Sequence, residues 1–373
     1  MAKPTSFAEW IKRIIRRIRS ALRRRTVAID MGACSVRVYL EDAGMIVDEP
    51  CLVAYDRAAD RIVEVGEQAR AMSGRTPADI ELIYPMEDGN LSRYEMTGKL
   101  IQYYVRQATK PLLRPPRVII TLPHTVSDED ESLLIQAARA GGAGKVFLME
   151  SILACAYGSG RDLSKPIGRM VVDIGACHTT AAVISMGGVV VSRTVPVGGN
   201  ALDEAIVAYV KSRYGLLISK RAGETIKKRI GALYVHHTVH SVEIRGRSVE
   251  TGAVQKMVIT SKEMIEAMTN PTVAIVDVIN DVLELTPEAL LSDIARDGMI
   301  LCGGNSLIYG FGRLIAKVTG APVRTLKDPA HTCVMGAVRA MQMQKVLELT
   351  PGIIHLQQQR QRRPGEAENG EPS

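Results

Sequence analysis

The segment Thr26-Val27-Ala28-Ile29-Asp30-Met31-Gly32-Ala33-Cys34-Ser35-Val36-Arg37-Val38-Tyr39-Leu40 has a counterpart 143 residues further along the chain, Arg169-Met170-Val171-Val172-Asp173-Ile174-Gly175-Ala176-Cys177-His178-Thr179-Thr180-Ala181-Ala182-Val183-Ile184. Each copy reads as a strand, a turn at Asp-x-Gly-Ala-Cys and a second strand. A hairpin duplicated at this distance predicts two related halves with a cleft between them. Short β-branched runs alternate with helical runs in the rest of the chain, which predicts an α/β architecture.

Each hairpin has the chemistry of a phosphate site. Its Asp ends a buried strand and can hold a metal-bound water, and the following Gly lets backbone N–H groups approach a phosphate oxygen. A third element, 298–308, runs from a strand into the Gly303-Gly304 loop and then into a helix, which suits a nucleotide phosphate or base. One Asp-x-Gly is most often a plain turn, but the three elements together predict a nucleotide site.

These three loops resemble the phosphate-1, phosphate-2 and adenosine motifs of the actin/Hsp70/hexokinase superfamily. From about residue 26 to 348 the chain resembles the MreB family of bacterial actin-like cell-shape proteins. The further motifs that carry this resemblance are Ile46–Pro50, 65–77, Met86–Gly89, Val195–Ile206, Ala222–Lys227, Thr319–Val323 and Asp328–Gly336. It implies an actin-like, two-lobed α/β fold of duplicated ribonuclease-H-like domains, which binds ATP and Mg²⁺ in the cleft between them.

The resemblance also implies a division of the chain. We expect a basic helix over 1–25, lobe I over 26–165 with an insert at about 50–100, and lobe II over 166–320 with an insert at about 200–265. Residues 321–350 return to lobe I, and 351–373 form a disordered tail. The polar end of this tail, from residue 357, lacks apolar anchors and is predicted to be disordered.

Matching motifs assign candidate cofactor-binding residues. The first loop supplies Asp30, Gly32, Ala33, Cys34 and Ser35, and the second supplies Asp173, Gly175, Ala176, Cys177 and His178, with Gly198, Gly199 and Asp203 continuing that half of the cleft. Glu224 and Lys227 are expected to bracket the ribose and adenine, and Gly303, Gly304, Asn305 and Ser306 to close the adenine pocket. Asp30 and Asp173 are expected to hold Mg²⁺ through water.

The second loop departs from the family pattern Asp-Ile-Gly-Gly-Gly-Thr-Thr. Two of its glycines are Ala176 and Cys177 here, and a Thr is His178. We expect the added Cβ atoms to crowd the γ-phosphate or to strain a turn that needs positive φ. For His178, a contact to the γ-phosphate competes with a simple polar substitution. For Cys34 and Cys177, a redox or metal role competes with the filling of space by two small residues.

The candidate catalytic residues are Asp130, Glu131 and Thr179. The family has Pro-x-x-x-Thr-x-x-Glu before a helix, and its Glu helps to position the attacking water. Here Asp130 takes that place one methylene short, while Glu131 is rotated by about 100° on the helix. Our hypothesis is that ATP binds while its hydrolysis is slow or lost, and the alternative is a working ATPase with relaxed spacing. Ser127 is predicted as the N-cap, which favours an ordinary acidic first turn over a metal-binding cluster at 128–131.

The net positive charge of the chain arises from its first 25 residues. They hold nine Lys or Arg and one Glu, a net of +8, whereas the whole chain is +7. Helical periodicity places Phe7, Trp10, Ile11, Ile14, Ile15 and Ile18 on one face, opposite Lys12, Arg13, Arg16 and Arg17. Such a helix suits an anionic membrane surface, where each basic residue contributes about 1 kcal/mol. Docking of the helix on the protein's own body and a transit peptide are the alternatives.

Bulk features narrow the class of protein. No stretch of 18 apolar residues occurs, so no membrane span is expected. The six cysteines form no CxxC pair, which fits a reducing cytoplasm. A nucleic-acid binder usually spreads basic charge over its folded surface, so no nucleic-acid partner is expected.

The family resemblance, together with the basic helix, implies a membrane-associated cytoskeletal protein that binds ATP, polymerises beneath the cytoplasmic membrane and organises cell-wall elongation and rod shape. The expected partners are further copies of the chain, anionic lipid, integral proteins of the elongation machinery and a paralogous MreB. A rival is a degenerate paralogue that acts as a non-hydrolysing scaffold or modulator of a regular MreB filament. A metabolic kinase and a chaperone of the same superfamily are disfavoured, because neither a substrate-binding insertion nor a β-rich peptide-binding domain is found.

Overall fold

A computed structural model describes residues 24–86, 94–110, 112–122, 126–235, 238–343 and 353–355. The predicted membrane-facing residues of the N-terminal helix lie outside these ranges, as does the predicted disordered tail except for residues 353–355. Those three residues form a strand, so the prediction of disorder is wrong there, because they pair with the edge of a sheet. Within the ranges, no helix combines the length and the apolar character that crossing a bilayer requires.

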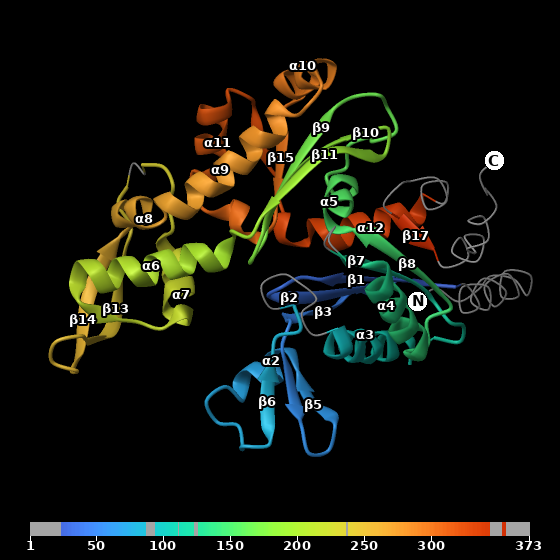
Figure 1. Cartoon of the computed structure of the whole chain (residues 1–373), viewed down its shortest axis with the longest axis horizontal. Coiled ribbons are helices and arrows are strands. Elements are labelled where there is room, and N and C mark those ends of the chain that lie inside the picture. The colour runs from blue at the N-terminus through green and yellow to red at the C-terminus, as the bar shows by residue number, and fades with distance from the viewer. Residues whose placement is uncertain are drawn as a thin grey trace, which may run out of the picture.

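The first half of the molecule, called lobe I below, is built on a six-stranded sheet in the order β17-β8-β7-β1-β2-β3 (Figure 1). Its strands are β1 (Thr26–Met31), β2 (Ser35–Leu40), β3 (Gly44–Pro50), β7 (Arg117–Leu122), β8 (Lys145–Glu150) and β17 (Ile353–His355). Helices α3 (Tyr94–Thr109) and α4 (Asp128–Ala140) pack on one face. A small sheet of β4 (Val53–Asp56), β5 (Arg61–Val65) and β6 (Ile80–Ile83) extends from it with α2 (Gly66–Ala71).

The second half, lobe II, has a five-stranded sheet in the order β11-β10-β9-β15-β16. Its strands are β9 (Arg169–Ile174), β10 (Thr179–Ser185), β11 (Gly188–Val195), β15 (Met299–Cys302) and β16 (Val323–Thr325), with helices α9 (Thr269–Glu284), α10 (Glu288–Asp297) and α11 (Phe311–Thr319). A second small sheet, β12 (Leu216–Leu217), β13 (Ser241–Ser248) and β14 (Val254–Thr260), carries α6 (Gly199–Tyr214), α7 (Lys220–Ile230) and α8 (Ser261–Ala267). The predicted duplicated, two-lobed α/β fold is confirmed.

The two predicted hairpins have the same geometry. The Gly32 N–H donates to the Ser35 carbonyl at 3.0 Å, and the Gly175 N–H donates to the His178 carbonyl at 2.9 Å. The third predicted element differs in one respect. Strand β15 is followed by a four-residue 3₁₀ turn, η2 (Gly304–Leu307), and the α-helix begins only at Phe311. The positive φ of Gly303 and Gly310 bends the chain on either side of this short turn.

Strand alternation directs both aspartates toward the junction of the lobes. On β1, Val27 and Ile29 pack against α3 and α4, whereas Ala28 packs on the opposite face, in a cluster with residues of α5 (Ser151–Gly158) and α12 (Thr332–Gln342). On β9, Val171 joins the same central cluster. Because side chains alternate along a strand, Asp30 shares the face of Ala28, and Asp173 shares the face of Val171.

Helices α5 and α12 cross between the two sheets with their backbones in contact. A Cβ at Gly336 would fall inside the contact distance of the Ala154 carbonyl oxygen, and one at Gly158 would overlap the Thr332 carbonyl. The opposing atoms belong to backbone, which cannot rotate away. The crossing therefore requires glycine at both positions.

The substitution Gly336→Ala should lower the free energy of unfolding by about 3 kcal/mol or more, because it overpacks a backbone crossing. Urea denaturation measures this change. The matched control is Gly98→Ala in α3, another helical glycine, whose added Cβ would meet the Ala137 Cβ at an ordinary 3.5 Å. The control should be neutral or slightly stabilising. Equal stability of the two variants would contradict a tight crossing.

Candidate nucleotide site

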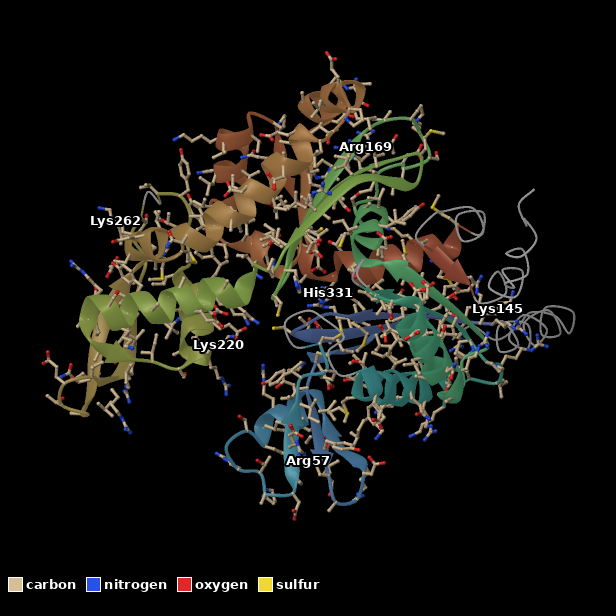
Figure 2. The ribbon with its side chains drawn as sticks, in the orientation of Figure 1. Arg57, Lys145, Arg169, Lys220, Lys262 and His331 are labelled. Carbon is tan, nitrogen blue, oxygen red and sulfur yellow. The ribbon has the colours of Figure 1, made fainter. Side chains whose placement is uncertain are left out.

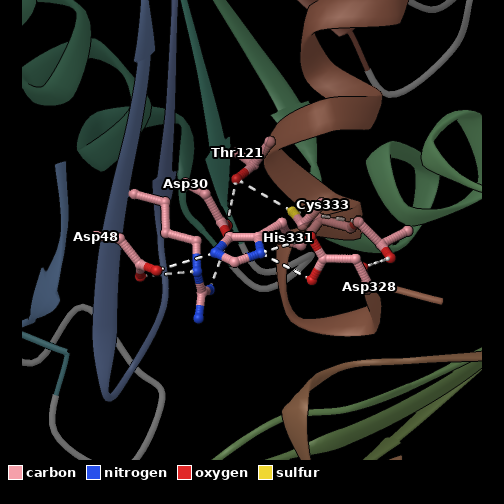
Figure 3. Close-up of polar contacts among 9 residues, drawn as sticks. Asp30, Asp48, Thr121, Asp328, His331 and Cys333 are labelled. Carbon is pink, nitrogen blue, oxygen red and sulfur yellow. Dashed lines mark hydrogen bonds and ion pairs between the residues drawn. The ribbon is translucent and has the colours of Figure 1, made fainter. Parts of the chain in front are cut away.

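Asp30 ends β1 and is held by two neighbouring side chains. The Thr121 hydroxyl on β7 donates to Asp30 Oδ1 at 2.8 Å, and Arg37 Nη1 lies 3.5 Å from Asp30 Oδ2 (Figure 3). Arg37 comes from the register position opposite Asp30 on β2, and its Nε also pairs with Asp48 at 3.2 Å. The carboxylate is therefore oriented before any ligand binds.

Asp173 occupies the equivalent position on β9 and is half-buried. Burial and then the negative charge of Asp30 raise the pKa of Asp173 to about 6, while Arg37 acts in the opposite direction. The two carboxylates are thus close enough to repel each other. Together with the Thr121 hydroxyl they form a set of oxygen donors, which is the set that Mg²⁺ prefers. These residues fit the expected cation.

The turn residues of the two hairpins are unstrained. Among the described residues, the only non-glycine residues with positive φ are Asp42, Asp60 and Met186. Ala176 and Cys177 therefore adopt ordinary backbone angles, and the expectation of strain in the second loop is wrong. The turn that the Gly175 N–H closes on the His178 carbonyl places neither residue in the left-handed region, so their Cβ atoms cause no strain in φ.

The second loop is fixed by two other elements. The N–H groups of Gly199 and Asn200 at the start of α6 donate to the carbonyls of Gly175 (3.0 Å) and Ala176 (2.8 Å). The Asn305 amide donates to the same Gly175 carbonyl at 2.7 Å. A Cβ at Gly198 would lie 2.6 Å from the Gly175 oxygen, so this approach requires glycine. The structure thus brings the second loop, the start of α6 and the Gly-Gly loop together.

Asn200 links the two hairpins, which the sequence analysis did not anticipate. Its Nδ2 donates to Cys177 Sγ at 3.2 Å, and its Oδ1 lies 3.7 Å from Cys34 Sγ. The matching turns of lobe I and lobe II therefore face each other across one amide side chain. Burial, and next the charge of Glu224, raises the pKa of the Cys34 thiol. The only feature of the sequence that could have pointed to Asn200 is its position two residues after Gly198, in a predicted segment of the site.

Other predicted residues have structural partners. Lys227 Nζ lies 2.9 Å from Asp203 Oδ1 and donates to the Gly199 carbonyl at 2.7 Å, and both side chains are buried. This pair joins α7 to α6. Glu224 is half-exposed and pairs with Lys228 at 2.6 Å. The Ser306 hydroxyl donates to the Gly303 carbonyl at 2.7 Å, while a Cβ at Gly304 would meet open space.

The candidate catalytic residues are engaged in different ways. The Thr179 hydroxyl is buried and donates to the Val197 carbonyl at 2.8 Å. Ser127 is the N-cap of α4, as predicted, and bonds with both the backbone N–H and the carboxylate of Asp130. Glu131 has a buried Oε2 without a hydrogen-bond partner among the described residues. Burial and then the charge of Asp128 raise the pKa of Glu131.

A further polar network lies beside the site and was missed from the sequence. His331, at the junction of the lobes in Figure 2, bridges Asp48 (2.9 Å) and Asp328 (2.8 Å). Burial opposes protonation of His331, but the two carboxylates outweigh it and raise its pKa. Asp48 also pairs with Arg37, so the network continues to Asp30 (Figure 3). His331 and Asp48 are 283 positions apart, so a single sequence does not show that they pair.

Comparison with known proteins agrees with this geometry. The family model described as MreB/Mbl protein matches residues 24–349. The cell shape-determining protein MreB of Escherichia coli (strain K12) is 37% identical over 323 residues, which cover 85% of this chain and 93% of that protein.

Solved structures give the same result. MreB5 of Spiroplasma citri, bound to ADP and to AMPPNP, is 29% identical, with TM-scores of 0.81 and 0.79. The matches cover 87% and 86% of this chain and 98% and 97% of MreB5. The MamK double helical filament is 20% identical, with a TM-score of 0.70 over 86% of this chain and 99% of MamK.

The two lobes and their paired hairpins define an actin-like protein. Both the family model and the relative from Escherichia coli extend over most of the sequence. The chain belongs to the MreB/Mbl family.

The raised pKa of Asp173 predicts a pH dependence of stability. The folded protein binds a proton at Asp173 more tightly than the unfolded chain does, so this contribution is complete below about pH 4 and is lost as the pH rises to about 6. The substitution Asp173→Asn should raise the free energy of unfolding at pH 7 by about 2 kcal/mol and flatten this decline. Urea denaturation between pH 4 and 8 tests both effects.

Asp297→Asn serves as a control of opposite sign. Arg296 and Arg169 hold the pKa of Asp297 at about 2, so its contribution is present at neutral pH and is lost only as the pH falls toward 2. This variant should be less stable than the wild type at pH 7. Destabilisation by both variants would contradict the prediction that the ionised Asp173 carboxylate destabilises the folded protein at pH 7.

Proposed function

We propose that this chain is an actin-like cytoskeletal protein that binds ATP with Mg²⁺ between its lobes. It assembles into filaments attached to the inner face of the cytoplasmic membrane, and these filaments organise cell-wall elongation and rod shape. The observation that carries the proposal is the pair of matching hairpins, which bring Asp30 and Asp173 together from the two lobes. Homologues carry the name cell shape-determining protein.

Nucleotide binding is supported by the site and by a relative. Both hairpin turns present small residues and backbone N–H groups, the combination that suits phosphate oxygens. The solved structures of MreB5 of Spiroplasma citri have ADP and AMPPNP bound. Mg²⁺ would be held by Asp30 and Asp173 through water, and it would neutralise phosphate charge. Thr121 and Arg37 orient Asp30, and the start of α6 and Asn305 fix the second loop.

The open space at Gly304 allows a test that leaves the fold intact. A Cβ there has no protein atom within 4 Å, yet the position falls in the proposed adenine pocket. Gly304→Val should therefore keep the wild-type melting temperature and lower the affinity for a fluorescent ATP analogue by at least about tenfold. The control is Gly188→Val, where the nearest atom to an added Cβ is 3.9 Å away. Unchanged affinity in Gly304→Val would exclude this pocket.

Filament formation and membrane attachment extend the same proposal. MamK, which shares the fold, is described as a double helical filament. The basic amphipathic residues 1–25 supply a lipid-facing element, and repetition along a filament would multiply weak attachments by avidity. Integral proteins of the elongation machinery and a paralogous MreB are the further proposed partners.

Electron microscopy of the protein on anionic liposomes tests assembly with ATP, with ADP and without nucleotide. We expect membrane-bound filaments with ATP. A chain that lacks residues 1–25 should lose liposome binding and keep its nucleotide affinity, because the basic charge resides in the deleted segment. Cosedimentation of the shortened chain with liposomes would move the membrane contact to the body of the protein, and absence of filaments in every condition would contradict assembly.

A second candidate function is a non-hydrolysing scaffold or modulator of a regular MreB filament. The contact that favours it is the capping interaction of Ser127 with Asp130, which occupies the shortened carboxylate proposed to position water. A displacement of about 1 Å at such a group can reduce a rate about 100-fold. A phosphate-release assay separates the two functions, since turnover like that of other actin-like ATPases would exclude the scaffold.

A further inference from the structure

Two buried thiols, those of Cys155 and Cys302, lie next to Asp173 where the lobes meet, and a third, that of Cys333, lies beside Cys155. Cys155 is on α5, Cys302 ends β15 and Cys333 is on α12. The Sγ atoms of Cys155 and Cys302 and one carboxylate oxygen of Asp173 all lie within 4.8 Å of one another. Cys302 is the register partner of Asp173 on the neighbouring parallel strand, so their side chains share a face.

The thiols of Cys155 and Cys302 interact with the Asp173 carboxylate, and their other hydrogen-bond acceptors are weak. Cys302 Sγ donates to the Val172 carbonyl at 3.4 Å, and Cys333 Sγ donates to the Thr121 hydroxyl at 3.4 Å and to the Ser151 carbonyl at 3.8 Å. Two thiolates and a carboxylate are a ligand set that zinc uses, and two sulfurs on a tetrahedral zinc ion lie about 3.8 Å apart. The cluster therefore needs only a small contraction to hold such an ion.

We propose that Cys155, Cys302 and Asp173 form a binding site for Zn²⁺ at the junction of the lobes. Cys333 is the nearest candidate for the fourth position, since its thiol interacts with that of Cys155. Binding releases the thiol protons of Cys155 and Cys302 to solvent and involves no oxidation. Two thiolates and one carboxylate leave one negative charge uncompensated by zinc, and Arg37, which interacts with Asp173, offsets it.

The position of the site gives it a consequence for the contact between the lobes. Cys155 follows the last strand of the lobe I sheet before α5, whereas Asp173 and Cys302 belong to the lobe II sheet. A bound ion would join the lobes. Asp173 is the half-buried ligand of the three, so the ion enters from its side. Zinc would also occupy the carboxylate proposed for Mg²⁺ and so compete with the Mg²⁺–nucleotide complex, a consequence that rests on the proposed function.

Cobalt titration of the nucleotide-free full-length protein under reducing conditions tests the site. We expect one equivalent of Co²⁺ to produce the sulfur-to-cobalt charge-transfer absorption of a tetrahedral thiolate site, and Zn²⁺ to displace it. Cys302→Ala and, separately, Cys155→Ala should weaken Co²⁺ binding by at least about 100-fold. The melting temperature of each metal-free variant shows whether it is folded.

Two controls locate the signal. Cys51→Ala removes a buried thiol of lobe I outside the cluster and should leave the absorption unchanged. The double variant Cys34→Ser/Cys177→Ser removes the thiols of the hairpin turns and should also retain it. Absence of the charge-transfer band in the wild type overturns the proposal, as does its survival in Cys302→Ala and Cys155→Ala or its loss in the double variant.

Measurements of nucleotide affinity distinguish failure of the metal site from failure of the proposed function. Zn²⁺ should lower the affinity of the wild type for the ATP analogue but not that of Cys302→Ala. If the analogue does not bind at all, the proposed function fails while the cobalt result still decides the metal site. If the analogue binds and cobalt does not, only the metal site is lost.

Discussion

The contact of α5 with α12 is the constraint on which the two-lobed structure depends. Both helices lie between the two sheets, and their backbones approach so closely at Gly158 and Gly336 that a methyl group would overlap a carbonyl. This closeness sets the separation of β1 from β9. It thereby sets the separation of Asp30 and Asp173. Asp30 lies on the same face of β1 as Ala28, and Asp173 lies on the same face of β9 as Val171. The packing of α5 against α12 therefore also determines the geometry of the candidate site.

The two carboxylates of the site, Asp30 and Asp173, repel each other, and a bound cation would reduce this repulsion. Burial and the neighbouring Asp30 raise the pKa of Asp173 to about 6. Arg37 partly compensates through its ion pairs with Asp30 and Asp48, and His331 extends the network to Asp328. A divalent cation between the carboxylates would replace repulsion by attraction. The stability of the empty protein and its capacity to bind a cation are therefore opposed, which is common at functional sites.

The departures from the family pattern have different structural weight. Ala176 and Cys177 stand where the family has glycines, and neither has a positive φ in the turn that Gly175 and His178 close. The side chain of Asp130, in contrast, is one methylene shorter than the family Glu, and it interacts with the N-cap residue of its own helix, Ser127. The altered phosphate loop is thus compatible with a bound nucleotide, while the altered helix weakens the case for hydrolysis. The loop and the helix affect separate steps.

The sequence by itself determined the duplicated hairpins, the α/β class, the Gly-Gly loop after β15 and the N-cap at Ser127. These features rest on local rules: strand alternation, turn residues and capping, each within a few residues along the chain. Only the tertiary structure decided that Asn200 links Cys34 to Cys177, that Lys227 is buried against Asp203, and that His331 reaches Asp48. It also decided that Cys155 and Cys302 lie beside Asp173. Such contacts join residues far apart in sequence, and they arise from how α5 and α12 seat the sheets against each other, which no local pattern encodes.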